Sequence, residues 1–109
     1  MPYIKQEDRV FLDQYIQELA SAINTKLPNG YETDNVDVME FAGEVNYAIT
    51  RLCCLVMGEK STYPKICMIT GVLENVKQEF YRRLAAPYEE NKIVQNGDVK
   101  EYKNLNLWR

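Results

Sequence analysis

Tyrosines lie close to arginines or lysines in three segments of this sequence. One is Tyr81-Arg82-Arg83, a second joins Tyr47 to Arg51, and a third is the short segment 3–5. Guanidinium groups bind phosphate oxygens through paired hydrogen bonds, and aromatic rings stack on bases. The pattern therefore predicts a site for a small anionic ligand. The candidate ligand-binding residues are Arg51, Arg82 and Arg83 for phosphates, Tyr47, Tyr81 and Tyr88 for stacking, and Tyr3, Lys5 and Lys92 as secondary contributors.

A structural interpretation competes with this one. Tyrosine is a common edge residue whose hydroxyl stays in water, and the chain has 8 tyrosines. On a helical wheel Arg83 falls in the apolar sector while Arg82 points away from it. A guanidinium in that sector needs a partner, and Glu79, one turn earlier, is suitably spaced. Arg83 therefore either pairs with Glu79 or binds phosphate.

Groups that usually catalyse reactions are scarce. The chain has no histidine, which excludes Ser/His and Cys/His pairs and histidine metal sites. None of its 5 glycines forms a phosphate-binding loop. The acidic run Asp34, Asp37, Glu40 and Glu44 has helical spacing and could gather a cation, but such runs are usually solvated helix starts. We expect no enzyme, cofactor or metal; a carboxylate–metal enzyme is the least favoured alternative.

Composition indicates a globular protein with one domain, residues 1–109. It has 46% hydrophobic and 27% charged residues, and a net charge of −3 disfavours binding to DNA or RNA polymers. Three cysteines, two of them adjacent, do not form a disulfide framework. The N-terminus has no apolar signal region, and the longest apolar run, 52–57, is too short for a membrane span. We expect a cytoplasmic protein.

Apolar periodicity predicts three helices, at about residues 6–25, 35–57 and 66–86. Pro28 to Gly30 separates the first two, Gly58 ends the second, and Pro87 ends the third or admits one more turn. Short connections are typical of an antiparallel bundle. The expected fold is an all-α, antiparallel three-helix bundle.

The C-terminal residues, about 92–109, predict a short β-hairpin and tail. Asn96-Gly97 suits a two-residue turn between short strands, and Trp108 places apolar bulk near the end of the sequence. The tail could dock on the bundle or on a second chain.

The predicted second helix has two faces that suit contacts. Its apolar stripe includes Val38, Val45 and Ile49, and the opposite face holds Gly43, Tyr47, Thr50, Arg51 and Cys54. A solvent face normally carries Lys and Glu, so we expect this one to contact a second copy, giving a dimer or tetramer. The alternative is a protein–protein adaptor or inhibitor that uses this face and the Trp108 tail.

Three motifs carry a family resemblance: MPYIK at the start, GEVNYAITR at 43–51, and EFYRRLAAPYEENKIVQNGDV at 79–99. With them the chain resembles a family of small uncharacterised proteins of phages and bacteria. It is also similar to phage anti-defence sponges, small oligomers that sequester cyclic dinucleotides and blunt CBASS immunity. That resemblance implies a non-enzymatic sponge in the host cytoplasm, holding a ligand such as cyclic GMP–AMP at a subunit interface.

Overall fold

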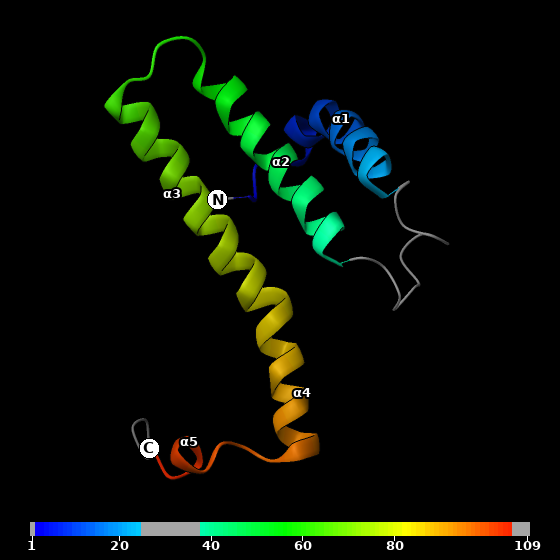
Figure 1. Ribbon diagram of the computed structural model, residues 1–109, viewed down its shortest axis with the longest axis vertical. Coiled ribbons are helices and arrows are strands. Elements are labelled where there is room, and N and C mark those ends of the chain that lie inside the picture. Colours follow the sequence, from blue (N-terminus) through cyan, green and yellow to red (C-terminus); the bar gives the residue numbers. More distant parts are fainter. Residues whose placement is uncertain (1, 25–37, 106–109) are drawn as a thin grey trace. The chain divides into compact units, whose positions relative to one another are not determined.

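The computed structural model describes the backbone of residues 2–24 and 38–105, and the side chains of 2–23 and 41–105. These residues form helices and no strand, which confirms the all-α class for this part of the chain. The helical elements, in chain order, are α1 (Gln6–Asn24), α2 (Val38–Met57), α3 (Tyr63–Phe80), the π-helical turn η2 (Tyr81–Ala85), α4 (Ala86–Asn96) and α5 (Lys100–Lys103) (Figure 1). Asp34, Asp37 and Trp108, and the side chains of Val38 and Glu40, lie outside the described residues.

The chain divides into two compact units, Met1–Thr70 and Gly71–Arg109. In the first unit, α1 lies beside α2 (Figure 1). Arg9 Nε donates to the carbonyl oxygen of Ile4 at 2.8 Å and ties the N-terminal segment to the start of α1. Phe11 and Tyr15, one turn apart, meet edge to face with ring centroids 5.4 Å apart. These contacts hold the N-terminal segment against the start of α1 and place two aromatic rings side by side on this helix.

A glycine ends α2. Gly58 has φ 76°, which is costly for residues with a side chain, and its N–H donates to the carbonyl of Cys54 at 3.2 Å. Helix α3 begins at Tyr63, earlier than the predicted 66, because Pro64 is well tolerated in a first helical turn. Lys65 Nζ donates to the carbonyl of Met57 at 3.2 Å and so links the two helix ends.

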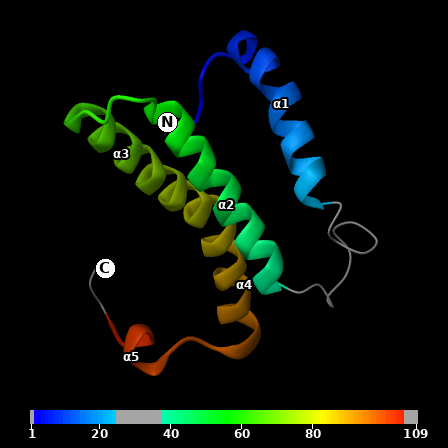
Figure 2. The ribbon, with the colours of Figure 1, turned by 45° about the horizontal axis from the view of Figure 1, so that its top comes forward.

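In the second unit, Pro87 does not end the helix as expected. The chain runs from α3 through η2 into α4 without a loop (Figure 2). The Ala86 N–H donates to the carbonyl of Tyr81, five residues back, which defines the π turn. Proline has no N–H and its ring crowds the preceding turn. The wider π turn lies just before Pro87, where it accommodates the ring while the helix continues.

The predicted hairpin at about 92–99 is wrong. Residues 92–96 belong to α4, and Gly97 caps this helix with φ 86° while its N–H donates to the Ile93 carbonyl at 2.8 Å. An Asn-Gly pair supplies a residue with positive φ to a helix C-terminus as readily as to a hairpin turn. The flanking segments are short and half polar, so the longer helix is preferred.

The described side chains form no closed core. None of them is buried, and large apolar side chains remain exposed along α1, α2 and α3. The antiparallel three-helix bundle and the single domain therefore stay predictions. In the described part of the chain, no helix combines the length and apolar character that crossing a membrane requires.

Candidate functional site

The second unit holds the largest group of predicted site residues. Tyr81, Arg82 and Arg83 are consecutive on η2, and Tyr88 and Lys92 follow on α4. All of these except Lys92, which is half-buried, are exposed. The π turn therefore joins three potential phosphate donors and two rings in one continuous helical segment.

Glu79 pairs with Arg82 in this segment. The Arg82 Nε–H donates to Glu79 Oε1 at 2.7 Å, and the Glu79 side chain is 24% exposed against 66% for Arg82. Of the two roles left open for Arg83, pairing with Glu79 is not the one that the structure shows. Arg83 makes no hydrogen bond or ion pair with any other described residue.

The Glu79–Arg82 pair has the i,i+3 spacing of an ordinary helical ion pair. A wheel drawn at 100° per residue assumes an unbroken α-helix, but a π turn takes more residues per turn and rotates the side chains that follow. Such a wheel therefore misplaces the α4 residues relative to the α3 stripe. Pro87 was the available signal for this irregularity.

Lys92 lies over the ring of Tyr88, one turn earlier on α4. Its Nζ is 5.5 Å from the ring centroid, which is a cation–π contact. The interaction orders both side chains and places a positive charge on the Tyr88 ring. The contact brings together one aromatic and one cationic residue of the predicted site.

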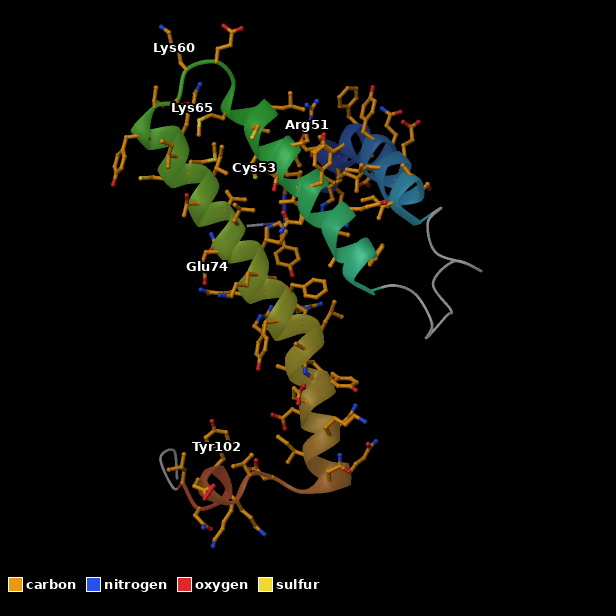
Figure 3. All side chains as sticks on the ribbon, in the orientation of Figure 1. Arg51, Cys53, Lys60, Lys65, Glu74 and Tyr102 are labelled. Carbon is orange, nitrogen blue, oxygen red and sulfur yellow. The ribbon has the colours of Figure 1, made fainter. Side chains whose placement is uncertain are left out.

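A hollow of 480 Å³ lies between α4 and α5. Tyr81 and Lys92 line it together with Glu89, Asp98 and Tyr102, which were not predicted as site residues. Figure 3 labels Tyr102 on α5. Asp98 Oδ1 accepts the Val99 N–H at 2.7 Å, so the loop before α5 is held by its own side chain. Tyr102 was not predicted as a site residue, because its segment was assigned to a hairpin and tail and no helix was expected at α5.

The other predicted residues belong to the first unit. Tyr47 and Arg51 line a groove of 710 Å³ between α1 and α2, with Leu19, Ala22 and Ile23 of α1 among the other lining residues. Figure 3 labels Arg51 on α2. Tyr3 and Lys5 are exposed in the segment before α1. The candidate residues are therefore divided between the two units of the chain.

This groove shows a neighbour of α2 within the chain. Gly43, Tyr47 and Arg51, whose face is expected to contact a second copy, line it together with residues of α1. Val45 of the expected core stripe is half-buried, while Ile49 remains 46% exposed. A wheel shows which residues share a face and not which neighbour covers that face. The groove therefore identifies the face of α2 that α1 borders.

No three cysteine or acidic side chains among the described residues gather as a metal-ligand cluster. Cys53, Cys54 and Cys67 are free thiols. Arginine forks, tyrosine rings and a lysine suit recognition of a planar or anionic molecule.

Residues 1–99 match the family described as Domain of unknown function (DUF6899). The chain belongs to this family. The match includes η2 and all of α4 and ends before α5, so Tyr102 lies beyond it. No curated protein and no solved structure matches the chain.

Proposed function

We propose that this DUF6899 chain is a non-enzymatic binding protein that self-associates and holds a small anionic ligand. The observation that carries the proposal is the helical segment 81–92, where two adjacent guanidinium groups precede the Tyr88–Lys92 cation–π pair. Guanidinium forks suit phosphate, and a tyrosine ring suits a base. The resemblance to phage sponges supports a cyclic dinucleotide such as cyclic GMP–AMP, sequestered in the host cytoplasm.

Charge placement favours one end of this segment for the anion. Glu89 and Glu90 follow Tyr88 on α4, whereas Arg82 and Arg83 are adjacent on η2. Arg82 uses its Nε for Glu79, but a guanidinium has five N–H donors, so this pair is compatible with phosphate binding. Phosphates would meet η2, and a base would meet Tyr81 or Tyr88.

Self-association is supported by the exposed apolar surface. No described side chain is buried. On α2, the apolar side chains of Leu52 and Leu55 are 56% and 66% exposed. Soluble monomers rarely leave contiguous apolar surface uncovered. A second copy, in a dimer or tetramer, would cover these side chains and complete the core.

Calorimetry with cyclic GMP–AMP tests the ligand. The wild-type protein should bind it, and the Arg82→Lys/Arg83→Lys variant should bind at least about tenfold more weakly, because an ammonium cannot form the paired hydrogen bonds of a guanidinium. The matched control is Lys77→Gln, which removes an exposed cation of α3. Equal affinity of the double variant and the wild type would remove both arginines from the site.

A protein–protein adaptor is the second candidate function. The groove between α1 and α2 supports it, since Leu19, Leu52 and Leu55 line this open groove, whose volume is 710 Å³. A wild-type chain that stays monomeric and binds no nucleotide would favour the adaptor.

A further inference from the structure

The groove between α1 and α2 carries opposite charges at two points along one face of α2. Glu44 and Arg51 both line it, with Ala48 between them and Leu55 beyond. Positions 44, 48, 51 and 55 are separated by steps of four, three and four residues, the spacing of a helix–helix seam. Glu44 and Arg51 lie about 10 Å apart along the helix axis. The seam is therefore acidic at one end and basic at the other.

The side chains beside this seam alternate in size. Tyr47, 66% exposed, lies beside Ala48, and Leu52 is 56% exposed. Gly43 is small, and a Cβ added at this position would meet no neighbouring side chain within 4 Å. On this face the Tyr47 and Leu52 side chains protrude, and there is open space at Gly43.

We propose that this groove binds α2 of a second copy in antiparallel orientation, with the two-fold axis beside Tyr47 and Ala48. The proposal deepens the self-association on which the proposed function rests. In this register Glu44 lies opposite the partner subunit's Arg51, and Arg51 lies opposite the partner subunit's Glu44. A two-fold axis creates both ion pairs from one pair of residues.

In this register Ala48 lies next to the partner subunit's Ala48 at the two-fold axis, where small side chains let the two helices approach closely. A parallel arrangement would place Glu44 against Glu44 and Arg51 against Arg51, which repel each other.

The area of this surface is at the lower end of the range for stable dimers. A helix of 20 residues is about 30 Å long, and α1 and α2 together are roughly 20 Å wide. That footprint of roughly 600 Å² approaches the ~800 Å² that each partner contributes to a standard interface. With α1 and α2 from each copy, the dimer is a four-helix arrangement that covers the groove residues.

A charge-exchange experiment tests the register. Sedimentation equilibrium without any nucleotide should show dimers for the wild type. Glu44→Arg and Arg51→Glu should each raise the dimer Kd at least about tenfold, since each places two like-charged pairs in the interface. Lys60→Glu, an exposed change in the loop before α3, should leave the Kd unchanged.

Mixing the two single variants gives the decisive result. In the heterodimer, each Arg from Glu44→Arg faces a Glu of the other chain, so an equimolar mixture should recover a Kd within about threefold of wild type. The double variant Glu44→Arg/Arg51→Glu should dimerise on its own for the same reason. Circular dichroism should show that all variants stay helical; a variant that is unfolded alone should regain helicity on mixing.

Three outcomes overturn the proposal: a monomeric wild type at about 100 μM, single variants that dimerise like wild type, or a mixture that stays monomeric. Ala48→Glu is a second variant, and it should raise the Kd because it places two carboxylates beside each other at the two-fold axis. Failure of the ligand proposal is distinguishable, because Arg82→Lys/Arg83→Lys should lose nucleotide binding without any change in dimer Kd.

Discussion

The Nε–H of Arg82 donates to Glu79 Oε1 at 2.7 Å, across the junction between α3 and the π turn. This pair links the last turn of α3 to the segment that carries the predicted phosphate donors. It also separates the roles of two adjacent arginines, because Glu79 orients Arg82 while Arg83 has no such pairing in the described structure. We therefore expect substitutions at Arg82 and Arg83 to have different effects.

Removal of the Glu79–Arg82 pair should have a small effect on stability. The Arg82 side chain is 66% exposed, and exposed ion pairs contribute about 0.2–1 kcal/mol. Glu79→Gln should lower the free energy of unfolding within that range in urea titrations, and the loss should shrink at high salt. Arg83→Ala should change it less. A larger loss for Arg83→Ala than for Glu79→Gln would contradict the observed pairing.

Replacement of Pro87 should remove the cause of the π turn. Pro87→Ala restores an N–H that can donate to the preceding turn, so the segment should become α-helical. The free energy of unfolding should rise by up to ~3 kcal/mol, the cost of proline in a helix interior. Amide and Cα chemical shifts of residues 81–86 should move towards α-helical values. Cyclic GMP–AMP binding should weaken, since the α4 residues rotate relative to Arg82 and Arg83.

Gly97 should not tolerate a side chain. Its φ of 86° and ψ of 154° lie in a region that only glycine occupies readily. Gly97→Ala should lower the free energy of unfolding by about 1–3 kcal/mol. Gly71→Ala is the control, because a Cβ added at this α3 glycine would meet no neighbouring side chain within 4 Å, and alanine favours helix by about 1 kcal/mol. In thermal unfolding, Gly97→Ala should lower the melting temperature and Gly71→Ala should raise it.

A charge at Tyr47 should weaken self-association. Tyr47 lines the α1–α2 groove, and Tyr47→Glu would place a second carboxylate beside Glu44 on each copy. The dimer fraction at about 10–50 μM should fall while circular dichroism stays helical. Tyr63→Glu adds the same charge at a tyrosine that is 76% exposed in the first turn of α3, and it should leave assembly intact. Equal effects of the two changes would remove Tyr47 from the interface.

A nucleotide bound by this protein should be released unchanged. The chain has no histidine and no phosphate-binding loop to activate water or a leaving group. Cyclic GMP–AMP incubated with excess protein and recovered after heat denaturation should elute as the intact cyclic molecule in chromatography. Buffer without protein is the control, and steady formation of linear products would show that the chain is an enzyme.

The sequence alone determined the helical class and the approximate places of the long helices. Apolar periodicity located α1 and α2, and Gly58 predicted the end of α2 because a helix C-cap needs a residue with positive φ. It also located the arginine and tyrosine segments, since residue type and spacing are local properties. Whether those segments form a binding site stays a prediction.

The tertiary structure decided what local patterns left open. Asn96-Gly97 suits both a hairpin and a helix cap, and only the extension of α4 through Pro87 selects the cap. The π turn rotates the residues that follow it, which a wheel of constant period cannot show, and Glu79 pairs with Arg82 although Arg83 is also within reach. The sequence of α2 shows two faces that suit contacts and could not say which of them α1 would border. That choice depends on packing between distant segments, which periodicity along one helix does not encode.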